Sequence, residues 1–353
     1  NMKTINYIYL ILIGLLASNQ VIAKVITVSN NPNSPGQYSS LQTAIDAALA
    51  KDTLYVAGSG LDYGNITITK PLIIIGAGAI PNKNLPLETY ISSINYGYTS
   101  NNASSGSGSR LTGCAIANIT FGTSSTYSNA ISNIVLSRNK ITNIYWNNGG
   151  QTIPYNNYLI ENNVITNIFG NSIRFNNGII KNNIINSVVL GVHGAGYWLF
   201  SNNVVLASFS SNRSATVTNN IFYVAYAASI ADNLYCTFTN NILYAIEGTF
   251  DDNAFNTGTN SGTGNIINVD PNFGHYDSFE TAIWSYSQST PEVAPYVDFN
   301  LLDSSPGKKY GTDGTDVGLH GGSTPFVEGS PADSRYRYFP LPQIPQVLDV
   351  TIN

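Results

Sequence analysis

Short runs of apolar residues alternate with asparagine-rich turns through the middle of the chain. Six segments of six residues share one pattern, with apolar residues at the first and last positions and a characteristic pair at the third and fourth. These segments are 136–141, 160–165, 180–185, 200–205, 217–222 and 238–243. The central pair is Asn-Asn in five of them and Arg-Asn in the first. With degenerate copies at 116–118 and 263–267, the first position of the pair falls at 118, 138, 162, 182, 202, 219, 240 and 264.

A repeat of about 20 residues fits one coil of a parallel β-helix. Helical repeats are longer, and leucine-rich repeats need a leucine frame that this chain lacks. Short Val, Ile and Phe runs broken by Asn and Gly are typical of strands separated by turns. Asparagine tolerates the left-handed backbone of a sharp corner, and its amide can bond to the same residue one coil away. The pattern therefore predicts an all-β solenoid with the asparagine pairs stacked at one corner.

The two ends of the repeat region carry different patterns. Residues 39–51 place Leu41, Ala44, Ile45, Ala48 and Leu49 on one helical face, with Ser39 or Ser40 as N-cap. This helix is expected to cap the open first coil. We expect a β-helix domain over 24–323 and a proline-rich tail over 324–353.

The N-terminus has the features of a signal peptide. Residues 7–17 form an apolar run, and Val21-Ile22-Ala23 provides suitable −3 and −1 positions. We expect cleavage after Ala23, a secreted or outer-cell-surface location, and no transmembrane segment in the mature chain. A membrane anchor is the alternative, although the run is short for a span.

Composition narrows the classes of function. Only 10% of residues are charged, with 15 Lys and Arg against 20 Asp and Glu and a net charge of −5, whereas 46 residues are asparagine. The acidic balance and the lack of basic runs argue against nucleic acid as a partner. A hydrophobic content of 43% excludes a disordered chain.

Several segments resemble secreted bacterial proteins of the pectate-lyase-like superfamily. Three segments are similar to the opening of these proteins: 40–46, 54–56 and 66–78. Two further segments are similar to their closing coils: 270–273 and 298–322. The resemblance implies a right-handed parallel β-helix. It does not imply one activity, because the superfamily includes lyases, hydrolases, esterases, epimerases and surface proteins without known chemistry.

One constellation of charged residues follows the repeat. Arg174, His193, Arg213, Asp232 and Asp252 are separated by 19, 20, 19 and 20 residues, which predicts one column on successive coils. β-Elimination on a uronic acid needs a cation beside the carboxylate and a base for the adjacent proton. Arg174 and Arg213 with His193 as base are the candidate catalytic residues. The alternative is a solvated polar face.

Four residues near this column are candidate substrate contacts. Tyr197 and Trp198 follow His193 closely, and Asp232 and Asp252 complete the column. Other aromatic residues six or seven positions after each asparagine pair either pack in the core or form a sugar platform: Tyr145, Trp146, Phe169, Phe209 and Tyr226.

Two classes of function stay open. The first is a non-catalytic rod that binds a polysaccharide or cell-surface component, or serves as structure. The second is a polysaccharide lyase acting on uronic-acid-containing glycans. No cofactor or metal site is predicted, although Asp313 and Asp316 hint at a calcium turn with too few acids.

The remaining polar and thiol groups have structural interpretations. Glu161 and Lys181 occupy the same position on adjacent coils, which predicts a surface ion pair. Cys114 and Cys236 match inward positions six coils apart, so both are expected as buried, unpaired thiols.

Overall fold

The computed structural model describes residues 23–78, 87–97, 105–122, 131–146, 155–173, 175–192, 196–275 and 298–326. The expected signal segment, apart from Ala23, and the tail from residue 327 onward lie outside these residues. Within the described ranges, no helix has the length and apolar character needed to cross a membrane.

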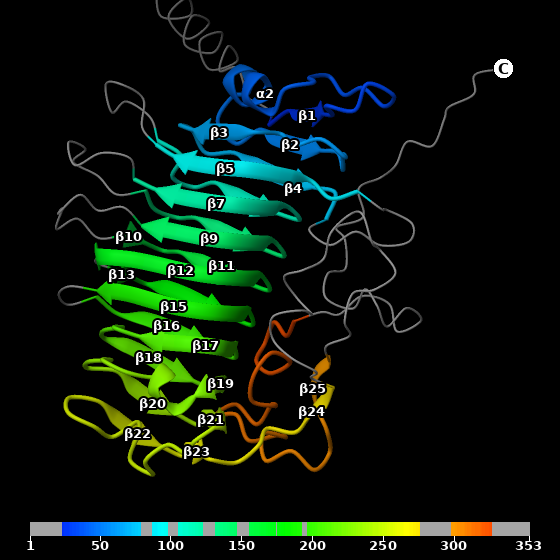
Figure 1. Cartoon of the computed structure of the whole chain (residues 1–353). Coiled ribbons are helices and arrows are strands. Elements are labelled where there is room, and N and C mark those ends of the chain that lie inside the picture. Colours follow the sequence, from blue (N-terminus) through cyan, green and yellow to red (C-terminus); the bar gives the residue numbers. More distant parts are fainter. Residues whose placement is uncertain are drawn as a thin grey trace, which may run out of the picture.

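Two long parallel sheets form the body of the molecule (Figure 1). The eleven-stranded sheet, sheet A, contains β1 Val25–Val28, β2 Thr53–Val56, β4 Ile73–Gly76, β6 Arg110–Thr112, β8 Val135–Ser137, β11 Leu159–Glu161, β14 Gly178–Lys181, β16 Trp198–Ser201, β18 Ala215–Thr218, β20 Thr237–Thr239 and β22 Ser261–Thr263. The ten-stranded sheet, sheet B, contains β3 Asn65–Ile68, β5 Tyr90–Tyr96, β7 Ala115–Phe121, β9 Lys140–Trp146, β12 Val164–Ile173, β15 Ile184–Val192, β17 Val204–Ser210, β19 Ile221–Tyr226, β21 Ile242–Glu247 and β23 Ile266–Ile267.

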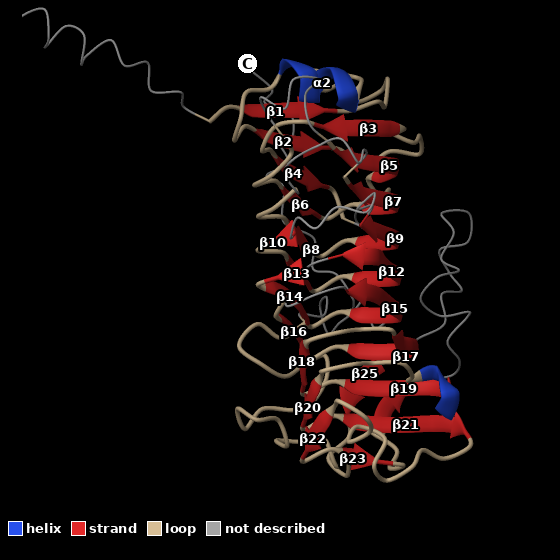
Figure 2. Cartoon of the chain, turned by 90° about the vertical axis from the view of Figure 1, so that its left-hand side faces the viewer, coloured by secondary structure: helices blue, strands red, loops and turns tan. Residues whose placement is uncertain are grey.

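The chain alternates between the two sheets as it descends the rod. Sheet B faces the viewer in Figure 1 with its strands running leftward, and the turned view of Figure 2 places sheet A on the opposite side of the coil. This course is right-handed, which confirms the predicted right-handed parallel β-helix. A two-stranded parallel pair, β10 Tyr155–Asn156 and β13 Phe175–Asn176, lies on the third side, and a single 3₁₀ turn, η1, spans Ala227–Ser229.

A short helix, α2 (Leu41–Ala47), covers the first coil. The Oγ of Ser40 caps it by accepting a hydrogen bond from the N–H of Thr43 at 3.3 Å. The helix is shorter than the expected 39–51, because Ala48 is already extended with ψ 149°. Leu49 is consequently 59% exposed rather than buried. Strand β1, which the sequence pattern did not predict, pairs with β2 before the helix begins.

The core of the coil consists of stacked inward columns of aliphatic and aromatic residues. In sheet B, Tyr96, Phe121 and Trp146 stack on consecutive coils, with ring centroids 4.9 and 5.5 Å apart. All three are at most 2% exposed. Such columns arise because parallel register places equivalent residues about 4.8 Å apart along the rod.

The two positions of the asparagine pair have different tasks at the corner between sheet A and sheet B. The first position adopts the left-handed conformation on every coil from Gly113 to Gly264, with φ between 51° and 71°. We call this set the turn column: Gly113, Arg138, Asn162, Asn182, Asn202, Asn219, Asn240 and Gly264. Asparagine and glycine suit it because both tolerate a positive φ.

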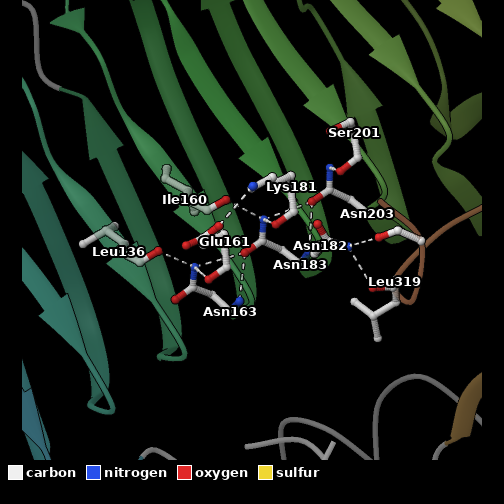
Figure 3. A network of polar contacts seen from close by, with 11 residues as sticks. Leu136, Ile160, Glu161, Asn163, Lys181, Asn182, Asn183, Ser201, Asn203 and Leu319 are labelled. Atoms are coloured by element: carbon white, nitrogen blue, oxygen red, sulfur yellow. Dashed lines mark hydrogen bonds and ion pairs between the residues drawn. The ribbon is translucent and has the colours of Figure 1, made fainter. Parts of the chain in front are cut away.

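The second position forms a buried amide ladder (Figure 3). The Oδ1 of Asn183 accepts hydrogen bonds from the backbone N–H and the Nδ2 of Asn163 at 2.9 and 3.0 Å. Its own Nδ2 donates to the carbonyl of Ile160 at 2.9 Å and to Oδ1 of Asn203 at 3.0 Å. The same arrangement joins the whole buried column: Asn139, Asn163, Asn183, Asn203, Asn220, Asn241 and Asn265. The predicted stacking of asparagine pairs at one corner is confirmed.

The strand register corrects the first repeat copy. Leu111 pairs with Leu136, so Gly113 and Cys114 occupy the two positions of the pair on that coil. Asn118 instead pairs with Asn143 and lies on the outside of sheet B. The placement at 118 was wrong because it required an asparagine, whereas the turn needs only a positive φ, which glycine provides.

Residues 298–326, which we call the strap, lie outside the coils. Strand β25 (Asp298–Leu301) pairs antiparallel with β24 (Phe273–His275). The strap covers an outward column of sheet B and forms a second hydrophobic cluster: Val164, Ile184, Val204, Leu206, Ile221 and Ile242 with Phe273, Phe299, Leu301, Val317, Leu319 and Phe326. Parallel coil pairing in the described residues therefore ends at β22 and β23, and the expected further coils up to 323 are replaced by this strap.

The turn column anchors the strap through side-chain amides. Nδ2 of Asn182 donates to the carbonyls of Leu319 and Gly321 at 2.9 and 2.8 Å. Nδ2 of Asn240 donates to the carbonyl of Tyr310 at 2.8 Å. The first asparagine of the repeat thus both turns the chain and holds the strap.

Both cysteines are buried and unpaired, as predicted. They stand in different columns, however. Cys114 begins the buried asparagine column, where its N–H donates to Oδ1 of Asn139 at 3.0 Å, whereas Cys236 precedes β20 in the core. Burial raises the pKa of the Cys114 thiol to about 12, which keeps it protonated and unreactive near neutral pH.

Candidate functional site

Two of the three candidate catalytic residues, Arg174 and His193, lie outside the described residues. The residues that precede them, Ile173 and Val192, are register partners in sheet B. The prediction that Arg174 and His193 form a base–cation pair therefore stays a prediction.

The expected column of charges does not extend to the later coils. Arg213 pairs with Leu234, not with Asp232. Asp232 has φ 57° and aligns with Ser211, which has φ 56° and whose N–H bonds to the carbonyl of Ala231. The shared column of Arg213 and Asp232 was wrong by two positions, because the partners Arg213 and Leu234 are 21 residues apart, whereas the predicted column assumed a spacing of 19. Asp252 is exposed in the separate turn region after Phe250.

The neighbouring aromatic residues Tyr197 and Trp198 have opposite surroundings. Trp198 begins β16, is 3% exposed, and donates its indole N–H to the carbonyl of Arg213 at 2.9 Å. It packs in the core and offers no surface to a substrate, so its assignment as a substrate contact was wrong. Tyr197 is 78% exposed and keeps its candidate role.

Tyr197 belongs to a column of residues that runs along the start of the sheet A strands, all of them exposed except the half-buried Ser214. Strand register aligns Val135, Leu159, Ile179, Leu199, Thr216 and Thr237, and the residue two positions earlier on each coil forms the column. We call it the exposed corner: Asn133, Asn157, Asn177, Tyr197, Ser214 and Tyr235. Its members follow one another at about 4.8 Å along the rod.

The upper half of the exposed corner is an amide ladder in contact with solvent. Nδ2 of Asn157 donates to Oδ1 of Asn133 at 2.9 Å, and Nδ2 of Asn177 donates to Oδ1 of Asn157 at 3.4 Å. These bonds use one of the two N–H groups on each donating amide. Because all three side chains are exposed, the remaining donor and acceptor capacity faces water and is available to a ligand.

The lower half carries aromatic and cationic groups. Tyr235 is 60% exposed although its backbone has φ 56°, a conformation uncommon for a bulky residue. The guanidinium carbon of Arg213 lies 5.5 Å from the centre of the Tyr235 ring, within the range of a cation–π contact. Tyr197 stands two coils above Tyr235, roughly 10 Å away. An exposed aromatic residue at a strained position indicates a role other than packing.

A second exposed pattern lies on the outside of sheet B. Tyr145 and Phe169 stack on adjacent coils with ring centroids 5.6 Å apart. Beside them, the side-chain amide of Asn143 forms hydrogen bonds of 3.0 Å with those of Asn118 and Asn167. Of the aromatic residues with two open interpretations, Trp146 and Phe209 are core residues, whereas Tyr145 and Tyr226 are exposed.

Some of the described titratable groups outside the exposed corner lie beside a group of opposite charge. Lys181 and Glu161 form the predicted surface ion pair at 3.3 Å. Burial raises the pKa of Glu88, partly offset by the nearby Lys140. Burial likewise lowers the pKa of Lys140, partly offset by Glu88. These opposing shifts are those of a partly buried pair of opposite charges.

Both acids of the possible calcium-binding turn, Asp313 and Asp316, form bonds with other protein groups. Oδ1 of Asp313 accepts from the Thr315 hydroxyl at 2.6 Å, which holds the pKa of Asp313 below its ordinary value. Oδ2 of Asp316 accepts from Lys308 at 2.9 Å. Among the described ranges, no group of three or more His, Cys, Asp or Glu side chains is placed to hold a metal ion.

Sequence reasoning missed most of the exposed corner. Its residues precede the turn column by five positions on each coil, for example Asn133 before Arg138, Asn157 before Asn162 and Asn177 before Asn182. A second, weaker asparagine repeat was therefore present in the sequence. It was hidden because three of the six coils carry Tyr or Ser at this position.

Comparison with known proteins adds no name to this geometry. No family model matches the chain, and no curated protein matches it. The site therefore has to be interpreted from its own chemistry.

Proposed function

We propose that this protein is an exported, non-catalytic rod that binds an extended glycan along the exposed corner. The observation that carries the proposal is the single line of amides, tyrosines and one arginine on consecutive coils. Sugars present hydroxyl groups to amides and C–H faces to aromatic rings. A linear polysaccharide lying along the rod would meet the amides on the upper coils and the aromatic rings on the lower ones.

Arg213 gives this surface a preference among glycans. Its guanidinium lies against the exposed Tyr235 ring, and arginine forms bidentate hydrogen bonds with carboxylates. We therefore infer that the preferred glycan carries uronic acid or other acidic groups near the lower half of the corner. The resemblance to secreted bacterial pectate-lyase-like proteins supports the same class of ligand and an extracellular location.

Binding to purified neutral and uronate polymers tests the proposal. Replacing either exposed tyrosine with alanine should weaken binding about tenfold, since an aromatic contact contributes on the order of 1 kcal/mol. Tyr226→Ala is the matched control, because Tyr226 is also exposed, at 58%, but lies at the end of β19, outside the corner. Arg213→Gln should weaken binding of uronate polymers more than of neutral ones, and the difference should shrink at high salt.

The same samples test the lyase alternative. Uronate polymers are incubated with the protein and assayed for unsaturated sugar products. Product formation that His193→Ala abolishes would overturn the non-catalytic proposal in favour of β-elimination. Binding that is unaffected by Tyr197→Ala and Tyr235→Ala would overturn the exposed corner as the site.

A further inference from the structure

A buried carboxylate lies at the point where the described chain begins. Asp52 is 1% exposed, just ahead of β2. Its Oδ1 accepts the backbone N–H of Lys24 at 2.7 Å, and its Oδ2 accepts the backbone N–H of Leu49 at 2.8 Å. Among the described residues, no Lys, Arg or His side chain forms an ion pair with Asp52.

This arrangement leaves a charge incompletely compensated. A buried carboxylate is costly unless it is paired, and neutral amide donors compensate it less well than a cation does. Asp52 also holds the cap together, because its N–H bonds to the carbonyl of Leu49 and its carbonyl accepts from Ile73. A cation at this place would stabilise the junction between the N-terminal strand, the end of α2 and the first coils.

The position of Lys24 coincides with a prediction made from the sequence alone. The sequence predicts export cleavage between Ala23 and Lys24, on the basis of Val21-Ile22-Ala23 alone. The structure places the N–H of this same peptide bond against Asp52. We propose that hydrolysis of the Ala23–Lys24 bond by an export peptidase creates an α-ammonium group at Lys24, and that Asp52 is the built-in acceptor of this group.

The chemistry of the step balances with water as the co-reactant. The peptide bond breaks, the acyl carbon of Ala23 leaves as a carboxylate, and the nitrogen of Lys24 becomes a primary amine. An α-amino group has an ordinary pKa of about 8, so it is protonated at neutral pH. A single neutral N–H donor is thereby replaced by a cation with several donors, and a charge-assisted hydrogen bond is about twice as strong as a neutral one.

Processing also has to precede docking. In the folded chain the N–H and the carbonyl of Lys24 are both bonded, to Asp52 and to the N–H of Thr53 respectively. A peptidase that binds the segment in extended form cannot reach a peptide bond held in this way. The cap therefore closes over the first coil after the leader has been removed.

Mass spectrometry of the exported protein and thermal unfolding of three full-length forms test this inference. The exported chain should begin at Lys24. Three forms are compared: a chain that begins at Lys24 with a free amine, one that begins at Lys24 with an acetylated α-nitrogen, and one that begins at Ala23. All three keep an N–H on the backbone nitrogen of Lys24, but only the first carries a positive charge on that nitrogen. The free-amine form should unfold at a temperature roughly 2–5 °C higher than the other two.

Two substitutions provide the controls. In Asp52→Asn the difference between the three forms should disappear. It should persist in Asp46→Asn, which changes an exposed acid on the nearby helix α2. If Asp52→Asn does not fold, the comparison of the three wild-type forms decides alone. Equal unfolding temperatures for these forms, or an exported chain that begins elsewhere, would overturn the proposal.

Discussion

Two asparagine columns run along this rod, and they have opposite relations to solvent. The buried column around Asn183 is 0% exposed through most of its length, and its amides bond to backbone and to one another. The side-chain amides of Asn133, Asn157 and Asn177 also form hydrogen bonds between coils, but these side chains are exposed. The same chemical group therefore specifies the fold in one place and is open to solvent in the other. Burial, not residue type, decides which.

The largest expected effect on stability comes from replacing asparagine with aspartate, once in the buried column and, in a separate variant, once in the exposed column. Asn183→Asp places a negative charge beside Oδ1 of Asn203 in a water-free position. We expect a loss of about 3–5 kcal/mol in the free energy of unfolding, as for other uncompensated buried charges. Asn177→Asp keeps an exposed side chain and should change stability by less than about 0.5 kcal/mol. Urea denaturation measures both, and similar losses would contradict the comparison.

A smaller effect separates the two tasks of the turn column. Asn182→Gly keeps the left-handed backbone but loses the bonds to Leu319 and Gly321, at a cost of about 1–2 kcal/mol. Asn182→Ala adds the strain of the left-handed conformation, about 1 kcal/mol more. Asn157→Ala is the control, since Asn157 has φ 58° but lies on the exposed corner, where its side chain bonds to Asn133 and Asn177 and to no described residue of the strap. Limited proteolysis within 298–326 should increase in both Asn182 variants only.

The smallest effect concerns the start of the buried column and depends on pH. Burial raises the pKa of Cys114 to about 12, above that of an unfolded thiol at about 8.5. An acid whose folded pKa is raised contributes stability that is complete below the unfolded pKa and is lost as pH rises toward the folded pKa. We expect stability to fall between about pH 9 and 12, with Tyr223, whose pKa burial raises to about 12, acting in the same direction.

Cys114→Ala tests this contribution. It should reduce the alkaline loss by on the order of 1 kcal/mol, measured by urea denaturation at pH 8 and pH 9.5. In the native wild-type protein at pH 8, neither thiol should react with iodoacetamide, whereas both should react after unfolding. Rapid alkylation of Cys114 in the native state would show that the upper end of the column is open to solvent.

The sequence predicted the features that have a clear local pattern and missed those that do not. The period, the strand chemistry and the two properties of asparagine were sufficient to predict the coils and their buried corner, and the helical spacing of apolar residues was sufficient to predict the cap. The strap could not be predicted in this way. Leu319 bonds to Asn182 across 137 residues, and no local pattern indicates where such a segment docks.

The candidate site was harder to predict than the fold for a related reason. Counting residues along the chain placed Arg213 and Asp232 in one column, whereas the coil between them is two residues longer than assumed, so that Arg213 pairs with Leu234. The direction in which Trp198 faces also depends on the register. A shift of one residue along a strand turns the side chain to the opposite face, which is why Trp198 is buried and the adjacent Tyr197 is exposed.

The difference in sequence separation between coil and strap contacts has a consequence for how this chain folds. Bonds between members of the buried asparagine column join residues 17 to 24 positions apart, whereas bonds between the turn column and the strap span 70 to 139 positions. Short loops close rapidly, and solenoid units add onto a formed neighbour, so coil stacking can proceed as a growing front. The strap finds its partners only after the coils from Val164 to Ile242 present a complete outer column. Strap docking is then the late kinetic event that closes the structure, and refolding followed by hydrogen exchange should show protection at Gly318 appearing after protection at Asn183.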